Sequence, residues 1–227
     1  MSLDKRYTLT SYEPVSITVT IPHVTPDDVE EAMYAMAGEK DGNSEDAMSP
    51  AWVKKNLGFD SINAFRKEAS KVAQERIEEE AFGTCAELVS GELGKRLVGE
   101  PDEELYKSVR EDAALRLKLQ LDDMRMSLRA YIERTGTTIE DLNAALDLQA
   151  NVMAHEQAAI AAYAAENNIV ADPVEWPQLL GVPEEELPNF ILRAKGMGRY
   201  EALCMAATNS KALVQLVREA HVEVVRE

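Results

Sequence analysis

The chain contains little that could form a disulfide framework, cross a membrane or enter a secretory pathway. Its two cysteines, Cys85 and Cys204, are too few for a disulfide scaffold in 227 residues and lack the spacing of metal ligands. No apolar run approaches the roughly 20 residues that span a bilayer. Residues 1–6 lack the apolar core of a secretory signal. We therefore expect a cytoplasmic protein without a membrane partner.

Positive charge is also scarce. The chain has 24 lysines and arginines against 41 aspartates and glutamates, which gives a net charge of −17. Binding to nucleic acid depends largely on cations that neutralise phosphates, and no basic patch is evident along the sequence. An acidic surface is also repelled by anionic lipids. The charge balance predicts neither a nucleic-acid partner nor a membrane partner.

Catalytic and cofactor-binding motifs are missing as well. A zinc-protease helix needs a second histidine one turn after His155, where the chain has Ala159. The Gly-Met-Gly of residues 196–198 continues to Glu201 where a dinucleotide loop has glycine. We expect no metal, no cofactor and no enzymatic activity. One alternative stays open here: an enzyme whose catalytic residues are distant in the sequence and come together only in the folded chain.

Apolar periodicity predicts a short extended entry followed by helices. Residues 15–21 alternate between β-branched apolar and polar side chains, which favours a strand within an extended segment of residues 1–24. Thr25 followed by Pro26 and two acids predicts the start of a linker helix over 25–37. The polar, breaker-rich stretch after it predicts a mobile loop over 38–59. The remainder, 60–227, is expected to form one helical domain together with 15–37.

The helices of this domain are long. Apolar residues recur at steps of three and four over 60–93, 101–134 and 139–166, and shorter helices are predicted over 184–195 and 199–219. Residues 221–225 are β-branched and favour an extended end. Leu115, Leu119 and Met126 lie off the main apolar face of 101–134, which indicates packing on more than one side or an exposed apolar strip. These patterns predict a mostly α architecture with long helical arms.

Four stretches of the chain follow one another in the order in which similar stretches occur in a known protein family. Residues 24–33 (VTPDDVEEAM) resemble the linker of the bacterial chaperone trigger factor, and residues 59–68 (FDSINAFRKE) resemble the entry to the long arm helix of its C-terminal domain. Residues 131–142 (YIERTGTTIEDL) resemble its helix–TG–helix joint. The stretch from 183–187 (PEEEL) through 211–213 to 220–222 resembles its closing helices. Together these stretches are distributed over most of the range 15–225.

The resemblance implies an arm-bearing helical body that cradles unfolded or partly folded polypeptides without ATP. The periplasmic chaperone SurA has a similar body. The ribosome-docking module of the family is absent, and only the loop after Gly38 stands where its peptidyl-prolyl isomerase domain would be inserted. Ribosome binding and isomerase activity are therefore not expected.

Flexible methionines and aromatic rings suit a surface that accepts many partners. The candidate peptide-binding residues on the long helices are Met124, Met126, Leu128, Tyr131, Met153 and Tyr163. A second hypothesis remains open at this point. The same helical arms could bind one folded partner or another copy of the chain, as in a structural or assembly protein that forms a homodimer.

Overall fold

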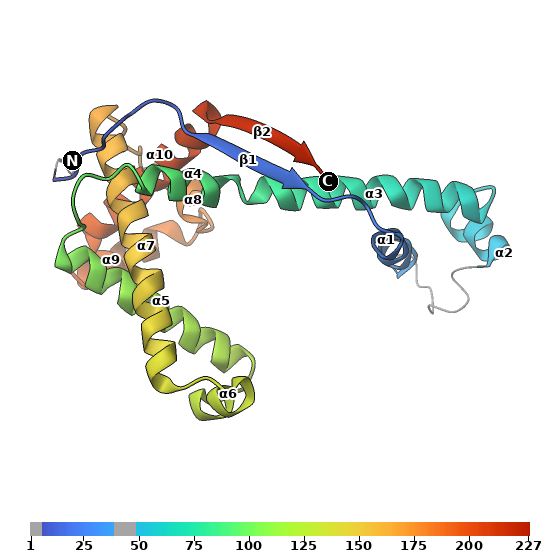
Figure 1. The fold of residues 1–227 in the computed structure, drawn as a ribbon, viewed down its shortest axis with the longest axis horizontal. Helices are drawn as coiled ribbons and strands as arrows, with labels where there is room; N and C mark the ends of the chain where they lie inside the picture. Colours follow the sequence, from blue (N-terminus) through green and yellow to red (C-terminus); the bar gives the residue numbers. More distant parts are fainter. Residues whose placement is uncertain (1–5, 39–48) are drawn as a thin grey trace. The chain divides into compact units, whose positions relative to one another are not determined.

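The computed structural model describes residues 6–38 and 49–227, and the chain is mostly helical (Figure 1). It divides into two compact units. The larger unit comprises Met1–Ser16 and Ala86–His221, and the smaller unit comprises Ile17–Cys85 and Val222–Glu227. This division differs from the predicted grouping of 60–227 with 15–37, because the long helical region beginning at residue 60 is shared between both units.

Two strands, β1 (Ser16–Ile21) and β2 (His221–Arg226), pair in parallel, and all but the first residue of each belongs to the smaller unit. The backbone N–H of His221 donates to Val15 O at 2.8 Å, and that of Glu227 donates to Ile21 O at 3.2 Å. Residue numbers thus rise together along both strands, and Figure 1 shows the two arrows pointing the same way. The alternating apolar side chains of β1 are buried, as the sequence pattern predicts.

Helix α1 (Pro26–Gly38) begins where the sequence predicts. The Asp28 carboxylate accepts from both the backbone N–H and the hydroxyl of Thr25, and Thr25 Oγ1 accepts from the Asp28 N–H at 3.3 Å. This reciprocal cap satisfies donors that the first helical turn leaves without intrahelical partners.

The predicted mobile loop over 38–59 is wrong for its second part. Residues Pro50–Trp52 form α2 and Val53–Leu57 form a π-helical turn, η2. Val53 is fully buried, so it anchors this segment to the core. Residues 39–48 of the predicted loop lie outside the described residues.

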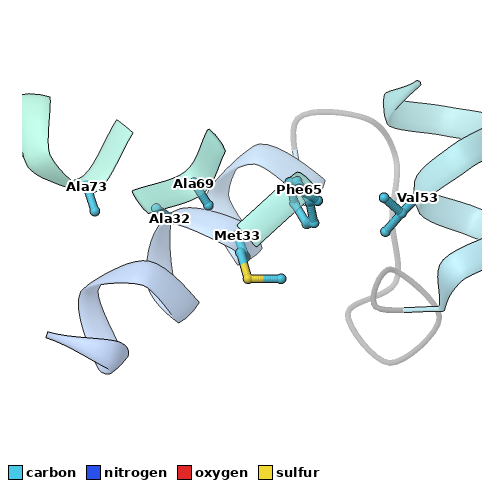
Figure 2. Packing of buried hydrophobic residues seen from close by; sticks show 6 residues of the cluster. All are labelled: Ala32, Met33, Val53, Phe65, Ala69 and Ala73. Carbon is cyan, nitrogen blue, oxygen red and sulfur yellow. The ribbon is translucent and has the colours of Figure 1, made fainter. Parts of the chain in front are cut away.

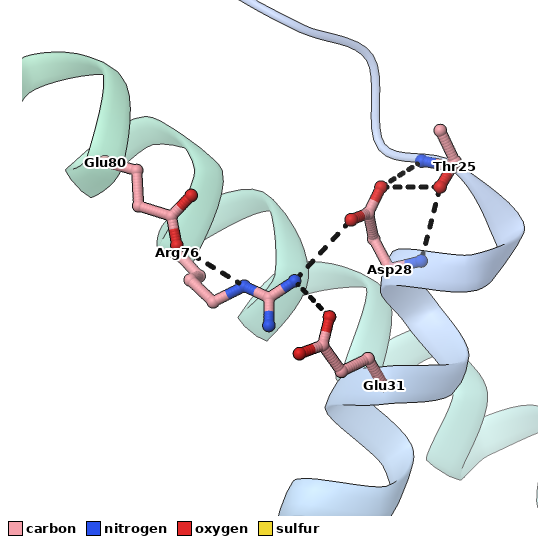
Figure 3. Close-up of polar contacts among 5 residues, drawn as sticks. All are labelled: Thr25, Asp28, Glu31, Arg76 and Glu80. Carbon is pink, nitrogen blue, oxygen red and sulfur yellow. Dashed lines mark hydrogen bonds and ion pairs between the residues drawn. The ribbon is translucent and has the colours of Figure 1, made fainter. Parts of the chain in front are cut away.

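Helix α3 (Ile62–Gly83) is capped by Ser61, whose Oγ accepts from the Ala64 N–H at 3.1 Å. Its buried face packs against α1, and the alanines at four-residue spacing let the two helices approach closely. Figure 2 shows the cluster, which comprises Ala32, Met33, Val53, Phe65, Ala69 and Ala73. On another face of the same helix pair, Arg76 forms ion pairs with Asp28 at 3.5 Å and Glu31 at 3.1 Å (Figure 3).

The helix predicted over 60–93 is interrupted. α3 ends at Gly83, and α4 (Cys85–Gly94) starts two residues later. The N–H and hydroxyl of Thr84 both donate to Ala81 O, at 3.3 and 2.7 Å, which tightens the last turn and ends the helix. Apolar periodicity continues across this break and therefore hides it.

In the larger unit, the N-terminal segment is fixed beside the end of α4. Leu9 and Leu97 form an antiparallel bridge, with backbone hydrogen bonds from Thr10 N to Arg96 O and from Val98 N to Thr8 O. The Tyr7 hydroxyl donates to Asp102 at 2.5 Å. Burial, followed by this hydrogen bond, raises the pKa of Tyr7 to about 12.

The helix predicted over 101–134 is two helices, α5 (Glu103–Asp123) and α6 (Leu128–Thr135). Arg125 adopts a left-handed conformation, with φ of 51°, which ends α5. Ser127 then caps α6 by accepting from the Ala130 N–H at 3.2 Å. A methionine-containing turn thus stands where the apolar pattern predicts continuous helix.

Helix α7 (Ile139–Glu166) confirms the third long helix, and Thr138 and Asp141 form its capping box. It is followed by α8 (Trp176–Leu180), α9 (Leu187–Gly196) and α10 (Tyr200–Glu219). α10 packs on α7, α8 and α9.

Cys85 and Cys204 are free and buried, as expected for small apolar side chains. Within the described part of the chain, no helix is both long and apolar enough to cross a membrane.

Candidate functional site

Helices α5 and α7 form the arm of the larger unit. They lie side by side, with α6 at the end where the chain turns (Figure 1). Val109 of α5 packs against Ala150 and Ala154 of α7. Nearby, the Arg110 guanidinium forms an ion pair with Asp147. The small alanines allow close contact between the two helices, and the ion pair fixes their register.

A groove opens where the arm meets α10. It has a volume of about 510 Å³, within the range of sites that hold small ligands or short peptide segments. α5, α7 and α10 contribute most of its walls, and the N-terminal segment contributes Arg6 and Tyr7. Its apolar lining residues are Leu105, Ile160, Ala161, Ala164, Val170, Ala202, Met205, Ala206 and Leu213.

The groove also has polar side chains, some of them charged and some of them neutral. Asp112 and Arg116 line it from α5, Gln157 from α7 and Asn209 from α10. Amides and hydroxyls can pair with the backbone N–H and C=O groups of an extended chain whatever its sequence. An apolar floor with such polar groups suits an unfolded polypeptide, which exposes apolar side chains and unpaired backbone together.

The α5 wall of the groove continues along the arm as an exposed apolar strip. Ser108, Asp112, Leu115 and Leu119 follow one another at steps of three or four residues, so they share one face of α5. Leu115 is 53% exposed and Leu119 is 54% exposed. Leu115 and Leu119 of the second apolar stripe seen in the sequence are therefore open to solvent. We call the groove together with Leu115 and Leu119 the arm groove.

Another exposed apolar pair lies on α7. Leu148 and Val152 are 69% and 48% exposed. They lie four residues apart, on the face of α7 turned away from Ala150 and Ala154, and neither lines the arm groove. This pair provides a comparison for any property assigned to Leu115 and Leu119.

The structure distributes the six predicted peptide-binding residues over several places. Met124, Met126, Leu128 and Tyr131 belong to the turn and helix at the end of the arm, where Met124 and Leu128 are exposed. Met153 lies about 20 Å along α7 from its first residue, at roughly 1.5 Å per residue. It packs against the α5–α7 cluster. The predicted set therefore does not form one surface.

The prediction for Tyr163 needs correction. Its side chain is 3% exposed, and its hydroxyl donates to Glu219 at 2.6 Å. It therefore joins α7 to α10 and does not lie on an open surface. Burial, followed by the hydrogen bond to Glu219, raises the pKa of Tyr163, and the same bond lowers the pKa of Glu219.

Sequence reasoning missed the polar residues of the arm groove. Asp112 and Arg116 lie four residues apart on α5, which is also the pattern of an ordinary solvated helix face. Gln157 and Asn209 come from two other helices. Only the packing of α5, α7 and α10 brings them together, so no local spacing signal could have identified them.

Among residues 6–38 and 49–227, no three histidine, cysteine or carboxylate side chains lie close enough together to hold a metal ion. Comparisons with protein-family models, with curated proteins and with solved structures found no match to this chain.

Proposed function

We propose that the protein is an ATP-independent, non-enzymatic chaperone-like protein that binds unfolded or partly folded polypeptides in the arm groove. The observation that carries the proposal is an apolar-floored groove whose α5 wall continues as Leu115 and Leu119, each about half exposed. Exposed apolar strips beside polar groups are typical of protein-interaction sites. The resemblance to the trigger factor C-terminal domain supports the same function.

Binding would occur by reversible burial of client side chains. Fully burying a leucine contributes about 1.5–3 kcal/mol, so a leucine that is already half buried contributes on the order of 1 kcal/mol. The net charge of −17 keeps a client complex soluble and favours basic clients. Weak apolar contacts of this kind allow release without an energy source.

The test is an aggregation assay in which guanidine-denatured rhodanese is diluted into buffer with an equimolar amount of the protein. The native protein should slow the rise in light scattering. Leu115→Ser with Leu119→Ser should weaken client binding roughly 30-fold, the ratio that corresponds to about 2 kcal/mol. Leu148→Ser with Val152→Ser removes a similar exposed apolar area from the other face of the arm and should leave the assay unchanged.

Two results would count against the proposal. The first is that the native protein leaves aggregation unaffected, and the second is that the two double variants lose activity equally. The second result would show that exposed apolar area as such, and not the arm groove, accounts for the effect. Circular dichroism of both variants checks that the helices are retained.

A second candidate function is assembly with one folded partner or with another copy of the chain. The exposure of Leu148 and Val152 on the outer face of α7 favours it. Multi-angle light scattering distinguishes the two functions. A dimer that persists on dilution and dissociates in the Leu148→Ser, Val152→Ser variant would support assembly, whereas a monomer that binds denatured rhodanese would support the chaperone.

A further inference from the structure

The smaller unit has a groove of its own, between α1 and the first half of α3. Its volume is about 1080 Å³, and its walls come from Val24–Met33 on one side and Ile62–Lys71 on the other. Five of the residues that line it are apolar, namely Val24, Pro26, Val29, Met33 and Ile62. This α1–α3 groove is separate from the arm groove, because every residue that lines it belongs to the smaller unit.

The α3 wall of this groove is basic. Arg66, Lys67 and Lys71 line it, and all three are exposed. Lys71 forms an ion pair with Glu68 at 2.8 Å. Arg66 and Lys67 form no ion pair with any residue in the described ranges. Ile62 and Asn63, in the first turn of α3, also line the groove, so the positive end of the α3 dipole adds to the local potential there.

This charge contrasts with the rest of the chain. Residues 50–71 contain five lysines and arginines against two carboxylates, in a protein of net charge −17. Farther along α3, Arg76 is surrounded by the carboxylates of Asp28, Glu31 and Glu80 (Figure 3). The pKa of Arg76 is raised, and its hydrogen bond to Glu31 is the largest cause. The α1–α3 pair thus neutralises one arginine within the fold and leaves Arg66 and Lys67 facing outward.

We propose that the α1–α3 groove binds an acidic polypeptide segment that carries apolar side chains. Carboxylates of the segment would pair with Arg66 and Lys67, and its apolar side chains would cover the floor around Val29 and Ile62. Glu30, the carboxylate on the α1 wall, directs the acidic groups of the segment toward the α3 wall. This site goes beyond the proposed chaperone function. The acidic surface as a whole favours basic clients, whereas the α1–α3 groove selects an acidic segment.

A peptide fits the groove better than other polyanions do. Nucleic acids and anionic lipid headgroups would meet the same cations, but they would leave the apolar floor uncovered, whereas the apolar side chains of a peptide would cover it. The wall from Ile62 to Lys71 is about 14 Å long, at roughly 1.5 Å per residue. It therefore accommodates about four extended residues of a peptide, at roughly 3.3 Å each.

Fluorescence anisotropy with a labelled peptide of about ten residues, built from alternating leucine and glutamate, tests the proposal (about 3.3 Å per residue lets it span the groove). The full chain should bind this peptide and should bind it less tightly at high salt. Lys67→Glu removes one ion pair and introduces repulsion, so we expect a loss of about three- to tenfold in affinity. Lys118→Glu, an exposed lysine of α5, makes the same change in net charge and should alter affinity by less than about twofold.

Three results would overturn the proposal. The first is absence of peptide binding, and the second is an equal loss in Lys67→Glu and Lys118→Glu. The third is tighter binding of oligothymidylate or of phosphatidylserine vesicles than of the peptide. A peptide with serine in place of leucine should bind more weakly, because it leaves the apolar floor uncovered. The outcome is independent of the rhodanese assay, since Leu115→Ser with Leu119→Ser leaves the α1–α3 groove unchanged.

Discussion

Replacing Phe65 with alanine tests what holds the smaller unit together. Phe65 of α3 is fully buried in the cluster that Figure 2 shows. The centroids of its ring and of the Phe59 ring lie 5.4 Å apart. A buried phenylalanine contributes about 1.5–3 kcal/mol through transfer from water, and the cavity left by truncation raises the cost to about 3–5 kcal/mol. Phe82 lies on the same helix but is 44% exposed, so Phe82→Ala should cost about 1 kcal/mol or less.

Urea unfolding measures the difference between these two variants. Trp52 packs at the core of the smaller unit, whereas Trp176 is buried in the larger unit. Fluorescence in a Trp176→Phe background therefore reports the smaller unit alone. If Phe65→Ala loses less than about 1 kcal/mol of unfolding free energy, or if Phe82→Ala loses as much as Phe65→Ala, burial does not determine the cost.

Two further changes test the supports of α7. Thr138→Ala removes the side chain that forms the capping box with Asp141 and should cost about 1 kcal/mol, with faster hydrogen exchange confined to the first turn of α7. Unchanged exchange there would contradict this assignment. Tyr163→Phe removes the hydrogen bond that lowers the pKa of Glu219. A carboxyl whose folded-state pKa is lowered stabilises the fold above its unfolded pKa and loses that contribution as pH falls. The difference in Tm between native protein and Tyr163→Phe should therefore shrink between neutral pH and about pH 3. A constant difference would refute the coupling.

Elements specified by local chemistry could be predicted from the sequence. The strand at 16–21 follows from alternating side chains, and the starts of α1 and α7 follow from Thr25 and Thr138 with the acids behind them. The breaks at Thr84 and Arg125 could not be predicted in the same way. Apolar periodicity continues through both positions. The hydrogen bonds of Thr84 to Ala81 O end α3, and the left-handed backbone of Arg125 ends α5.

The candidate sites depend on contacts that no local pattern contains. The arm groove needs α5, α7 and α10 packed together, and the burial of Tyr163 depends on Glu219 from α10. The total charge does not predict the basic wall at Arg66 and Lys67, because a strongly negative sum conceals a local excess of cations. Burial of Val53 in a breaker-rich stretch was hidden for a similar reason: average polarity does not reveal a single anchoring side chain.

The parallel pairing of β1 with β2 has a consequence for how the chain is made. β1 is translated near the beginning of this sequence, but the residues that pair with it begin at His221. Bringing the two strands together closes a very long loop, so it is entropically unfavourable until the intervening helices have formed. A nascent chain released before Arg226 would keep β1 as an unpaired edge, able to join other unfinished chains.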